Sequence, residues 1–462
     1  MQVQERRRPP IKVRDTLTIE IEGLGHAGEG VGRTNGFAVF VADAIPGDKA
    51  LIRIDEVKKN FGRGTLIELL QISTQRTDPG CEVSKDCGGC QLRHMEYSAQ
   101  LKWKQQNIID ALTRIGRFTN PLVEPVIGMQ SPKHYRNKVH YPVGASKGKS
   151  ALGFYKKGSH QLVPINTCHN VHPLCNKALQ VIGPLLHKYD LSPYNSSVGK
   201  GLLRHVICRV STTNNELMVI LVTNDEVIPH FDGLLKDLQT SLPEMVTLAL
   251  NINHSRSRVV LGRKTNILWG EPYLIEKIND LKFAISPNSF FQVNSLQAEV
   301  LGKQVVDYAA LGADSRALDC YSGTGTLALH LAKAGANVIG VEVVADAVRD
   351  AVLNAELNGL HKTDFRVGQV ETVLAEILKE GSVDAAVLDP PRKGCEPEVL
   401  KNVIEAKIPR LVYVSCNPSS LARDLALLGE GGYKLKEIQP IDMFPHTSHV
   451  EAVALLTRSR TI

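Results

Sequence analysis

A cysteine that follows an apolar run is the residue best placed for chemistry in this sequence. Cys416 lies in Ser415-Cys416-Asn417-Pro418, directly after the run Leu-Val-Tyr-Val at 411–414. Such a run predicts a buried strand, and the carboxyl ends of parallel strands carry the sites of open α/β sheets. A thiol held there can act as a covalent nucleophile. The commoner alternative is a cysteine that only fills core space, but the polar neighbours of Cys416 favour the nucleophile.

Glu451 is the candidate base that such a thiol would need. It follows His446-Thr447-Ser448-His449-Val450 and precedes the apolar run 452–456. The uracil ring is a substrate that suits this pair, because its C5 is a poor nucleophile until a thiolate adds at C6. A base must then remove the C5 proton before the cysteine can leave. A structural role for Glu451 is the alternative, and His446 and His449 are expected to pack or hydrogen-bond around the site.

Residues 318–327 (LDCYSGTGTL) predict a strand, a glycine turn and the start of a helix. The glycines let the backbone close under a ligand, and the helix N-terminus offers free N–H donors. Glu342 comes 23 residues after Asp319, a spacing that suits ribose hydroxyls. Asp389, in Asp389-Pro390-Pro391-Arg392, ends a later strand and would meet the adenine or the reacting base. A lone G-x-G is often only a turn; here the missing third glycine argues against a dinucleotide and favours S-adenosylmethionine.

Three further cysteines predict a metal site. Cys81, Cys87 and Cys90 form C-x5-C-G-G-C, and Cys168 or Cys175 is available as a fourth ligand. The spacing leaves zinc and an iron–sulfur cluster open. Nine cysteines, an odd number spread over 462 residues, argue against a disulfide framework.

The chain is too long for a single core, and its patterns predict three parts with limits at 1–75, 76–285 and 286–462. The first part has short strands at 17–21, 37–41, 49–54 and 64–70, which predict a small oligonucleotide-binding type β-barrel. Its clustered glycines, Gly23, Gly25, Gly28, Gly30 and Gly32, are expected in tight turns and at close backbone approaches. They are not expected to form a phosphate loop.

A helix is expected at 98–115, after the cysteine-bearing linker. The rest of the second part alternates β-type runs with one helix near 174–189, so we expect an α+β domain. From about residue 288 strands alternate with helices, which predicts a multidomain α/β protein with a C-terminal, doubly wound, Rossmann-like parallel sheet.

The net charge of +6 is concentrated in residues 131–160, which contain seven bases and no acid. The bases are Lys133, Arg136, Lys138, Lys147, Lys149, Lys156 and Lys157, interleaved with Tyr135, Tyr141, Phe154 and Tyr155. Cations with stacking rings are what single-stranded nucleic acid requires, although a solvated loop is the alternative. No apolar run reaches the length of a membrane span, and residues 1–12 lack the apolar core of a signal peptide. We therefore expect a cytoplasmic protein without a membrane partner.

Taken together, these motifs resemble the RNA (uracil-5-)-methyltransferases, specifically the 23S ribosomal RNA branch, over essentially the whole chain. The resemblance implies a TRAM domain in the first 75 residues and a [4Fe-4S] cluster on Cys81, Cys87, Cys90 and Cys168. The context of Cys168, Cys-His-Asn-Val-His-Pro at 168–173, is similar to that of the fourth ligand, except that His169 stands where the family has proline.

The resemblance also implies the roles of single residues. Phe290-Phe291-Gln292-Val293-Asn294 is similar to the segment whose glutamine contacts S-adenosylmethionine, so Gln292 joins Tyr321, Glu342 and Asp389 as expected cofactor ligands. Cys416 matches the nucleophile and Glu451 the base. The expected partner is 23S ribosomal RNA, bound by a monomer with the target uridine flipped into the site.

Other functions remain open from the sequence. An RNA cytosine-C5 methyltransferase also uses a cysteine nucleophile, but Arg392 stands where such an enzyme usually has a second cysteine. An amino-group methyltransferase would carry an aromatic residue at that position. A transfer RNA enzyme of the uracil family is expected to lack both the barrel and the cysteine motif. A non-catalytic RNA-binding assembly factor would explain the barrel but not the thiol and its carboxylates. Which uridine is modified cannot be read from the sequence.

Overall fold

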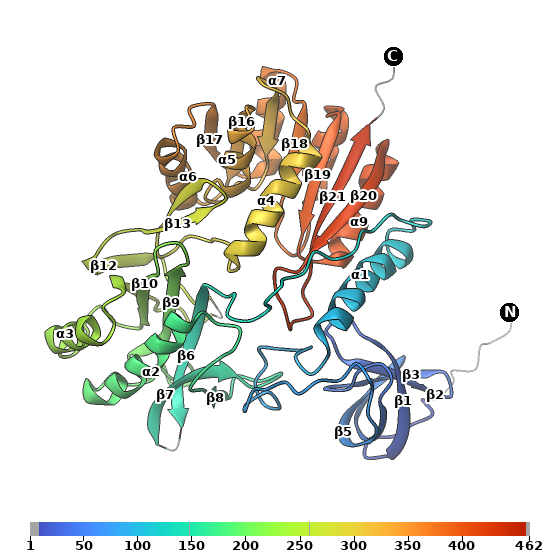
Figure 1. Cartoon of the computed structure of the whole chain (residues 1–462), viewed down its shortest axis with the longest axis vertical. Coiled ribbons are helices and arrows are strands. Elements are labelled where there is room, and N and C mark those ends of the chain that lie inside the picture. Colours follow the sequence, from blue (N-terminus) through green and yellow to red (C-terminus); the bar gives the residue numbers. More distant parts are fainter. Residues whose placement is uncertain (1–8, 147, 258, 459–462) are drawn as a thin grey trace.

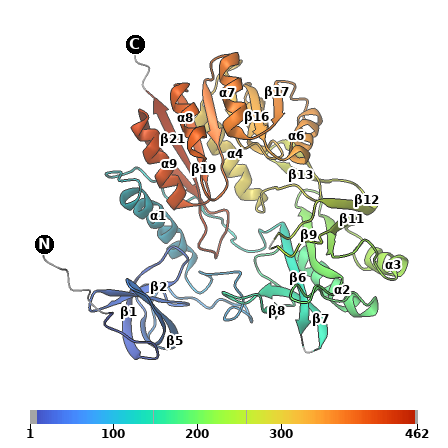
Figure 2. The ribbon, with the colours of Figure 1, turned by 180° about the vertical axis from the view of Figure 1, so that it is seen from behind.

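The computed structural model describes residues 9–146, 148–257 and 259–458. A closed barrel (blue) is followed by an open sheet (teal to green) and by a second, larger α/β unit (yellow to red), as Figure 1 shows. Figure 2, the view from behind, shows α1 between the barrel and the C-terminal unit. Among the described residues no helix has the length and apolar character needed to cross a membrane. Lys147 of the predicted basic segment lies outside the described residues.

The N-terminal barrel closes in the order β1-β2-β3-β5-β4. Its strands are β1 Thr16–Leu24, β2 Gly30–Thr34, β3 Phe37–Val41, β4 Lys49–Val57 and β5 Phe61–Gln71. The four strands predicted from the sequence are confirmed, but β2 was expected to be turn. A Cβ on Gly32 would lie 2.4 Å from the carbonyl oxygen of Glu20. Gly32 is therefore a strand residue where two backbones approach closely.

The middle sheet has seven strands in the order β12-β11-β10-β9-β6-β7-β8. They are β6 Lys138–Ser146, β7 Lys149–Tyr155, β8 Leu162–Pro164, β9 Leu203–Ser211, β10 Glu216–Thr223, β11 Met245–Ile252 and β12 Lys264–Gly270. Helices α2 (Pro173–Lys188) and α3 (Phe231–Ser241) pack their apolar side chains on one face. The sequence predicted only the first helix, because α3 buries just Leu234 and Leu238 and so has a short apolar stripe.

The C-terminal sheet has the order β17-β16-β15-β18-β19-β21-β20, so successive strands are added outward on one side of β15 and then, from β18, on its other side. Its strands are β15 Arg316–Asp319, β16 Asn337–Glu342, β17 Thr363–Val367, β18 Ala385–Leu388, β19 Arg410–Ser415, β20 Tyr433–Ile441 and β21 Glu451–Arg458. Strands β15 to β19 are parallel, and β21 inserts antiparallel to β19. The predicted doubly wound sheet is confirmed, and its switch point is the place where such sheets bind ligands.

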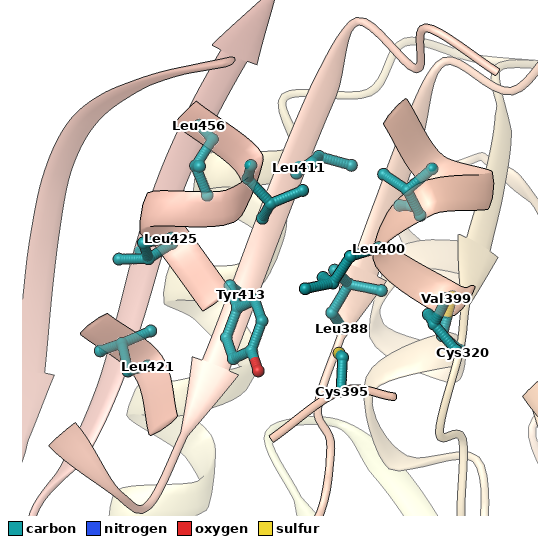
Figure 3. Close-up of a cluster of buried hydrophobic side chains, with 14 of the residues drawn as sticks. Cys320, Leu388, Cys395, Val399, Leu400, Leu411, Tyr413, Leu421, Leu425 and Leu456 are labelled. Carbon is teal, nitrogen blue, oxygen red and sulfur yellow. The ribbon is translucent and has the colours of Figure 1, made fainter. Parts of the chain in front are cut away.

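Helices cover both faces of this sheet. They are α4 Ser295–Ala309, α5 Thr326–Lys333, α6 Ala345–Leu357, α7 Val370–Glu380, α8 Pro397–Glu405 and α9 Pro418–Glu430. Figure 3 shows part of one core, where Leu411 and Tyr413 of β19 lie beside Leu421 and Leu425 of α9. The hairpin of β13 (Leu274–Ile278) and β14 (Leu281–Ile285) precedes α4.

Helix α1 (Tyr97–Arg114) belongs by its packing to the C-terminal unit. Its buried Ile108 and Leu112 share one apolar core with Leu421 and Leu425 of α9. The helix was predicted from the sequence, but its partner 300 residues further along the chain was not. It brings the segment that follows the cysteine motif against the C-terminal half of the protein.

Candidate active site

The glycine loop joins β15 to α5 at the switch point of the C-terminal sheet. Gly323 and Gly325 have φ values of +53° and +83°, a conformation that residues with a Cβ rarely adopt. Gly325 is the N-cap of α5, so the unpaired N–H groups of the first helical turn lie at the carboxyl end of the sheet. The loop therefore presents hydrogen-bond donors at the edge where a small ligand would bind.

Two carboxylates lie beside this loop. Glu342 at the end of β16 accepts hydrogen bonds from the N–H of Gly323 at 3.2 Å and of Val344 at 2.8 Å. Asp319 at the end of β15 is fully buried and accepts from the N–H of Tyr321 at 3.4 Å. Its other oxygen has no hydrogen-bond partner among the described residues. Burial, with a contribution from the charge of Glu342, raises the pKa of Asp319 to about 7. An unpaired buried oxygen is an acceptor that a ligand can satisfy.

Tyr321 and Gln292, the other two expected cofactor ligands, lie on different segments of the C-terminal unit. Tyr321 follows Cys320 in the glycine loop, and burial together with the neighbouring Cys395 raises the pKa of its hydroxyl. Gln292 is half-buried in the segment between β14 and α4. Its carbonyl oxygen accepts a hydrogen bond from Asn137 Nδ2 at 3.2 Å, which ties this segment to the middle sheet.

Cys416 and Glu451 lie opposite each other at the end of two antiparallel strands. The register pairs Ser415 of β19 with Ala452 of β21, so the next two positions along the pair are Cys416 and Glu451. Cys416 lies one position beyond the end of β19, and the charge of Glu451 acts on its thiol. The thiol is half-buried and Glu451 is only 5% exposed. The structure thus brings together two residues that the sequence predicted as nucleophile and base.

The charges of the site form a connected series from the loop to the thiol. Burial raises the pKa of Cys416 to about 11; the charge of Glu451 adds to this effect and that of Arg392 opposes it. Burial and the charge of Asp389 raise the pKa of Glu451 well above its usual range. Burial and the charge of Asp319 in turn raise the pKa of Asp389. The glycine loop and the thiol therefore belong to one site.

Arg392 supplies the positive charge of this site. Its Nη2 lies 3.3 Å from Nε2 of His449, and its carbonyl oxygen accepts a hydrogen bond from Asn417 Nδ2 at 2.8 Å. Burial, and then the charge of Arg392, lower the pKa of His449 to about 4, so this imidazole is neutral at pH 7. The sequence showed the arginine after Pro390-Pro391 but assigned it no role, because nothing local indicates that it faces Cys416.

The loop 442–450, which leads into Glu451, is held by α1. The side chains of Lys104 and Asp442 are fully buried and form an ion pair of 2.5 Å. Lys104 also donates to the carbonyl of Phe444 at 3.1 Å, and Gln100 Oε1 accepts from the N–H of His446 at 3.0 Å. No sequence signal marks these supporting residues, which are separated from the loop by more than 300 positions.

The cysteine motif is bonded to the same loop. The N–H groups of Gln91 and Leu92 donate to the carbonyl of His446 at 3.1 and 3.0 Å. The side chain of Gln91 also bridges the carbonyl of Gly88 at 2.9 Å and the N–H of Ser448 at 3.4 Å. The segment that follows Cys87 therefore reaches the loop that precedes Glu451.

Four cysteines lie close enough for their charges to affect one another. Burial raises the pKa of Cys90 to about 12, and the charges of Cys168, Cys87 and Cys81 add to this effect. Asn170 Nδ2 donates to the sulfur of Cys90 at 3.2 Å, and the N–H of Gly89 donates to that of Cys87 at 3.4 Å. Cys175 is instead buried in the core of the middle domain.

A site for a single metal ion is not present at these cysteines. Within the described part of the chain no group of three or more histidine, cysteine or acidic side chains is arranged to hold one ion. The four thiols are nevertheless free and half-buried, and the charge of each affects the pKa of its neighbours. Two of them accept N–H···S hydrogen bonds.

The basic segment differs from its prediction in two of its rings. Tyr135 is buried and donates its hydroxyl to the carbonyl of Pro445 at 3.1 Å, and Tyr141 is buried in the middle core, donating to the carbonyl of Cys175 at 3.2 Å. Neither ring can stack on a base. The prediction was wrong for Tyr141 because alternate residues of β6 point into the core. It was wrong for Tyr135, which precedes β6, because this ring packs under the loop that carries Pro445. Tyr155, with 39% of its surface exposed, is available for stacking.

A cavity of about 710 Å³ lies between the barrel, the cysteine motif and the end of β7. Its lining includes Arg63, Gly88, Tyr155, Lys156 and Lys157. The cavity does not include Cys416 or the glycine loop, so it is separate from the site described above. Its bases are already engaged: Arg63 pairs with Glu29 at 3.1 Å and Lys157 with Asp43 at 2.6 Å.

Comparison with known proteins places this geometry in context. Residues 96–459 match the family model of tRNA (uracil-5-)-methyltransferases, and residues 10–67 match that of the TRAM domain. A protein of Oceanobacillus iheyensis, named an uncharacterised RNA methyltransferase, is 42% identical over 97% of this chain and 98% of its own. A protein of the same name from Caldanaerobacter subterraneus is also 42% identical, over 97% of this chain and 99% of its own.

A solved structure is similar over nearly the whole chain. It is the Pyrococcus abyssi tRNA (uracil-54, C5)-methyltransferase in complex with S-adenosyl-L-homocysteine, with a TM-score of 0.75 and 29% identity. The match covers 96% of this chain and 100% of that one, so it includes most of the barrel. The expectation that a transfer RNA enzyme of this family would lack the barrel is therefore wrong for this relative.

Proposed function

The chain belongs to the tRNA (uracil-5-)-methyltransferase family, and we propose that it methylates C5 of uridine in RNA through a covalent adduct with Cys416. The observation that carries the proposal is that Cys416 follows the end of β19, where Ser415 pairs with Ala452, and that the charge of Glu451 acts on its thiol. This pair lies on the sheet whose switch point carries the glycine loop. A methyltransferase without covalent catalysis would need no thiol at this position.

Each residue of the pair has a separate step in the proposed reaction. Cys416 gives its proton to solvent water and its thiolate adds to C6 of the uracil, so the electrons of the C5–C6 double bond move toward O4. S-adenosylmethionine, when bound, supplies an electrophilic methyl group, which C5 takes. Glu451 then accepts the C5 proton; the C5–C6 double bond re-forms and the bond to the Cys416 sulfur breaks.

The charges around the thiol set the conditions for this reaction. With a pKa of about 11, Cys416 is almost entirely protonated at neutral pH. Arg392 favours the thiolate, whereas ionised Glu451 disfavours it. We propose that Arg392 is the group that offsets the carboxylates when the thiolate forms.

The cofactor ligands are proposed to be Gln292, Tyr321, Glu342 and Asp389. Glu342 already orders the glycine loop through Gly323, so its carboxylate is fixed in place for ribose hydroxyls. Asp319 adds an unpaired buried oxygen at the same edge. The bound S-adenosyl-L-homocysteine of the similar Pyrococcus abyssi enzyme supports this cofactor.

The cysteines Cys81, Cys87, Cys90 and Cys168 are proposed to hold a [4Fe-4S] cluster. The mutual effect of their charges and the N–H···S hydrogen bonds support a thiolate-ligated group, since N–H donors stabilise sulfur anions. Because the neighbouring Gln91 and Leu92 bind the loop before Glu451, the cluster would act by holding that loop in position.

The RNA is proposed to be 23S ribosomal RNA, on the resemblance of the cysteine motif to that branch. Transfer RNA is a second candidate, favoured by the full-length likeness to the Pyrococcus abyssi enzyme, which acts on tRNA uracil-54. In either case the TRAM barrel and the exposed bases of segment 131–160 would hold the flanking RNA.

The deciding experiment measures methyl transfer from labelled S-adenosylmethionine to ribosomal and transfer RNA transcripts, followed by nucleoside analysis. 5-Methyluridine in ribosomal RNA alone supports both the chemistry and the substrate, and 5-methyluridine in transfer RNA alone assigns the second candidate. 5-Methylcytidine, or no transfer to either RNA, contradicts the proposal. Cys416→Ala is expected to lose all transfer while binding S-adenosyl-L-homocysteine as wild type does; full activity in this variant excludes the covalent route.

A further inference from the structure

The loop 442–450 contains a histidine whose backbone is left-handed. His446 has a φ of +66°, in a region that residues with a Cβ rarely adopt, and it is only 8% exposed. Such a conformation is sterically unfavourable for every residue except glycine, and it persists only where the surrounding structure holds it. The contacts of His446 must therefore offset this cost.

The backbone of His446 is held from two sides. Its carbonyl oxygen accepts from the N–H groups of Gln91 and Leu92, directly after the cysteine motif, at 3.1 and 3.0 Å. Its N–H donates to Oε1 of Gln100 on α1 at 3.0 Å. Gln100 is fully buried and also donates through Nε2 to the carbonyl of Met95 at 2.7 Å. Two segments from the N-terminal part of the chain thus fix one residue near its other end.

The imidazole of His446 is bound to the same glutamine. Its Nδ1 lies 3.2 Å from Nε2 of Gln100. An amide nitrogen only donates, so Nδ1 is the acceptor and the ring proton lies on Nε2. Burial, and then the charge of Arg93, lower the pKa of His446 to about 4, so the ring is neutral at pH 7, as this contact requires. Gln100 therefore binds both the backbone and the side chain of His446.

The residues after His446 continue this fixed path. Thr447 Oγ1 donates to the carbonyl of Phe444 at 2.8 Å and accepts from the N–H of His449 at 3.3 Å. His449 is the imidazole whose Nε2 lies 3.3 Å from Nη2 of Arg392. Hydrogen bonds therefore order the loop from His446 to the residue that contacts the cation of the site.

Glu451 lies where this loop joins the sheet. It is the first residue of β21 and pairs with Ile441 of β20, so the sheet fixes the chain on its C-terminal side. On its N-terminal side the path of the chain depends on the loop. A different backbone conformation at His446 would turn the peptide units that precede Glu451, and a small displacement of a reacting group is enough to slow a reaction strongly.

We propose that His446 is a positioning residue for the methyl transfer. Its left-handed backbone, held by the cysteine segment and by α1, sets the path of the chain into Glu451 and so the place of the carboxylate that accepts the C5 proton. The inference rests on the proposed function, because His446 acts in that reaction only through Glu451. Its effect therefore falls on the removal of the C5 proton, which releases the adduct, and not on the binding of RNA or cofactor.

The test varies the backbone preference at this position. His446→Gly and His446→Val both remove the ring, but glycine adopts a positive φ freely whereas a β-branched residue does not. We expect kcat of His446→Val to lie at least about tenfold below that of His446→Gly, with no rise in KM for RNA or for S-adenosylmethionine. Labelled methyl groups should accumulate in a covalent protein–RNA adduct of the valine variant. Equal kcat in the two variants, or a difference in KM alone, would overturn the proposal.

His230 provides the matched control. It has a φ of +51° and is exposed at the N-cap of α3, in the middle domain. His230→Gly and His230→Val change the same backbone preference, and they are expected to give equal kcat values. A difference as large as that at His446 would refute a role that belongs to the loop before Glu451.

A second pair of variants leaves the sequence of the loop unchanged. Gln100→Met removes the amide that holds His446, and Gln106→Met makes the same substitution at an exposed position of α1. The methylated adduct is expected to accumulate in Gln100→Met and not in Gln106→Met. Equal amounts of adduct in these two variants would contradict the proposal, and this comparison decides it if His446→Val does not fold.

Hydrogen exchange followed by mass spectrometry separates this inference from the proposed function. Peptides that cover residues 442–451 should exchange faster in His446→Val than in His446→Gly. If wild-type protein methylates no RNA and forms no adduct, the proposed function fails, whereas the exchange rates still decide whether the backbone of His446 fixes the loop. Equal exchange in the two variants would overturn the inference even where methylation is found.

Discussion

Replacing Lys104 by methionine is expected to destabilise the protein by leaving Asp442 buried without its cation. Both side chains are fully buried at a separation of 2.5 Å, so no water replaces the lost ammonium group. Removing one partner of such a pair costs about 3–5 kcal/mol. Asp442 keeps its bonds from the hydroxyl of Tyr97 at 2.9 Å and from the N–H of Phe444 at 3.3 Å, so we expect the lower end, about 3 kcal/mol.

Urea unfolding of Lys104→Met and Lys102→Met measures this effect. Lys102 is exposed on the same helix, so its variant is expected to stay within about 0.5 kcal/mol of wild type. Adding Asp442→Asn to Lys104→Met is expected to recover part of the loss, because it removes the unpaired charge. A difference below about 1 kcal/mol between the two lysine variants would refute the reasoning, since a buried charge left unpaired cannot cost so little.

The same variant reports on the position of Glu451. Lys104 holds the loop that ends at this residue, and a displacement of 1 Å at a reacting group can cost about 100-fold in rate. We expect kcat of Lys104→Met to fall by up to about that factor, with S-adenosyl-L-homocysteine affinity unchanged. An unchanged kcat in a destabilised variant would show that the ion pair supports only the fold.

Three further outcomes are expected. The rate at which iodoacetamide alkylates Cys416, followed by peptide mass spectrometry, should rise about tenfold per pH unit toward pH 11. Glu451→Gln should lower the pKa of Cys416 and Arg392→Met should raise it. Shifts of the same sign in both variants would contradict the opposite effects of these two charges on the thiol. The raised pKa of Asp319 means that the folded state holds its proton more tightly than the unfolded state, so the free energy of unfolding should fall as pH rises from 4 to about 7. Urea unfolding of Asp319→Asn should show a weaker fall, and parallel profiles would count against the raised pKa. After anaerobic reconstitution, Cys168→Ser should lose bound iron and acid-labile sulfide while Cys175→Ala keeps both; equal iron in the two variants would move the fourth ligand elsewhere.

The residues that sequence reasoning found are those with a local signal. Cys416 was predictable because an apolar strand and a polar turn adjoin it, and Glu342 because its spacing from Asp319 follows from one strand–helix–strand unit. Gln292 has no such signal and came only from a resemblance. The partners Lys104 and Asp442 are 338 positions apart, so their pairing depends on tertiary packing that no local pattern encodes.

The errors of the sequence reading have physical causes as well. Tyr141 looks like a stacking ring beside lysines, but the twofold alternation of β6 sends Val139 and Tyr141 inward and Lys138 to the other face. Tyr135 precedes this strand and is buried by its contact with Pro445, a residue far away in the sequence. The close backbone approach expected of the clustered glycines occurs at Gly32, but the strand β2 that contains it was not predicted, because glycine at a close approach and glycine in a turn cannot be distinguished by residue type. The proposed limits at 75/76 and 285/286 stay predictions, and α1 packs across them.

Helix α1 packs on residues that the ribosome synthesises much later than the helix itself. Lys104 and the apolar residues Ile108 and Leu112 leave the ribosome 338 positions ahead of Asp442. At about 5–20 residues per second, the helix waits roughly 20–70 s for the surface that covers it. During this time an amphipathic helix and the cysteine segment before it stay exposed in the growing chain. The order of synthesis thus leaves the four cysteines accessible before the C-terminal half covers their neighbours, and it exposes an apolar helix face to aggregation while the chain is made.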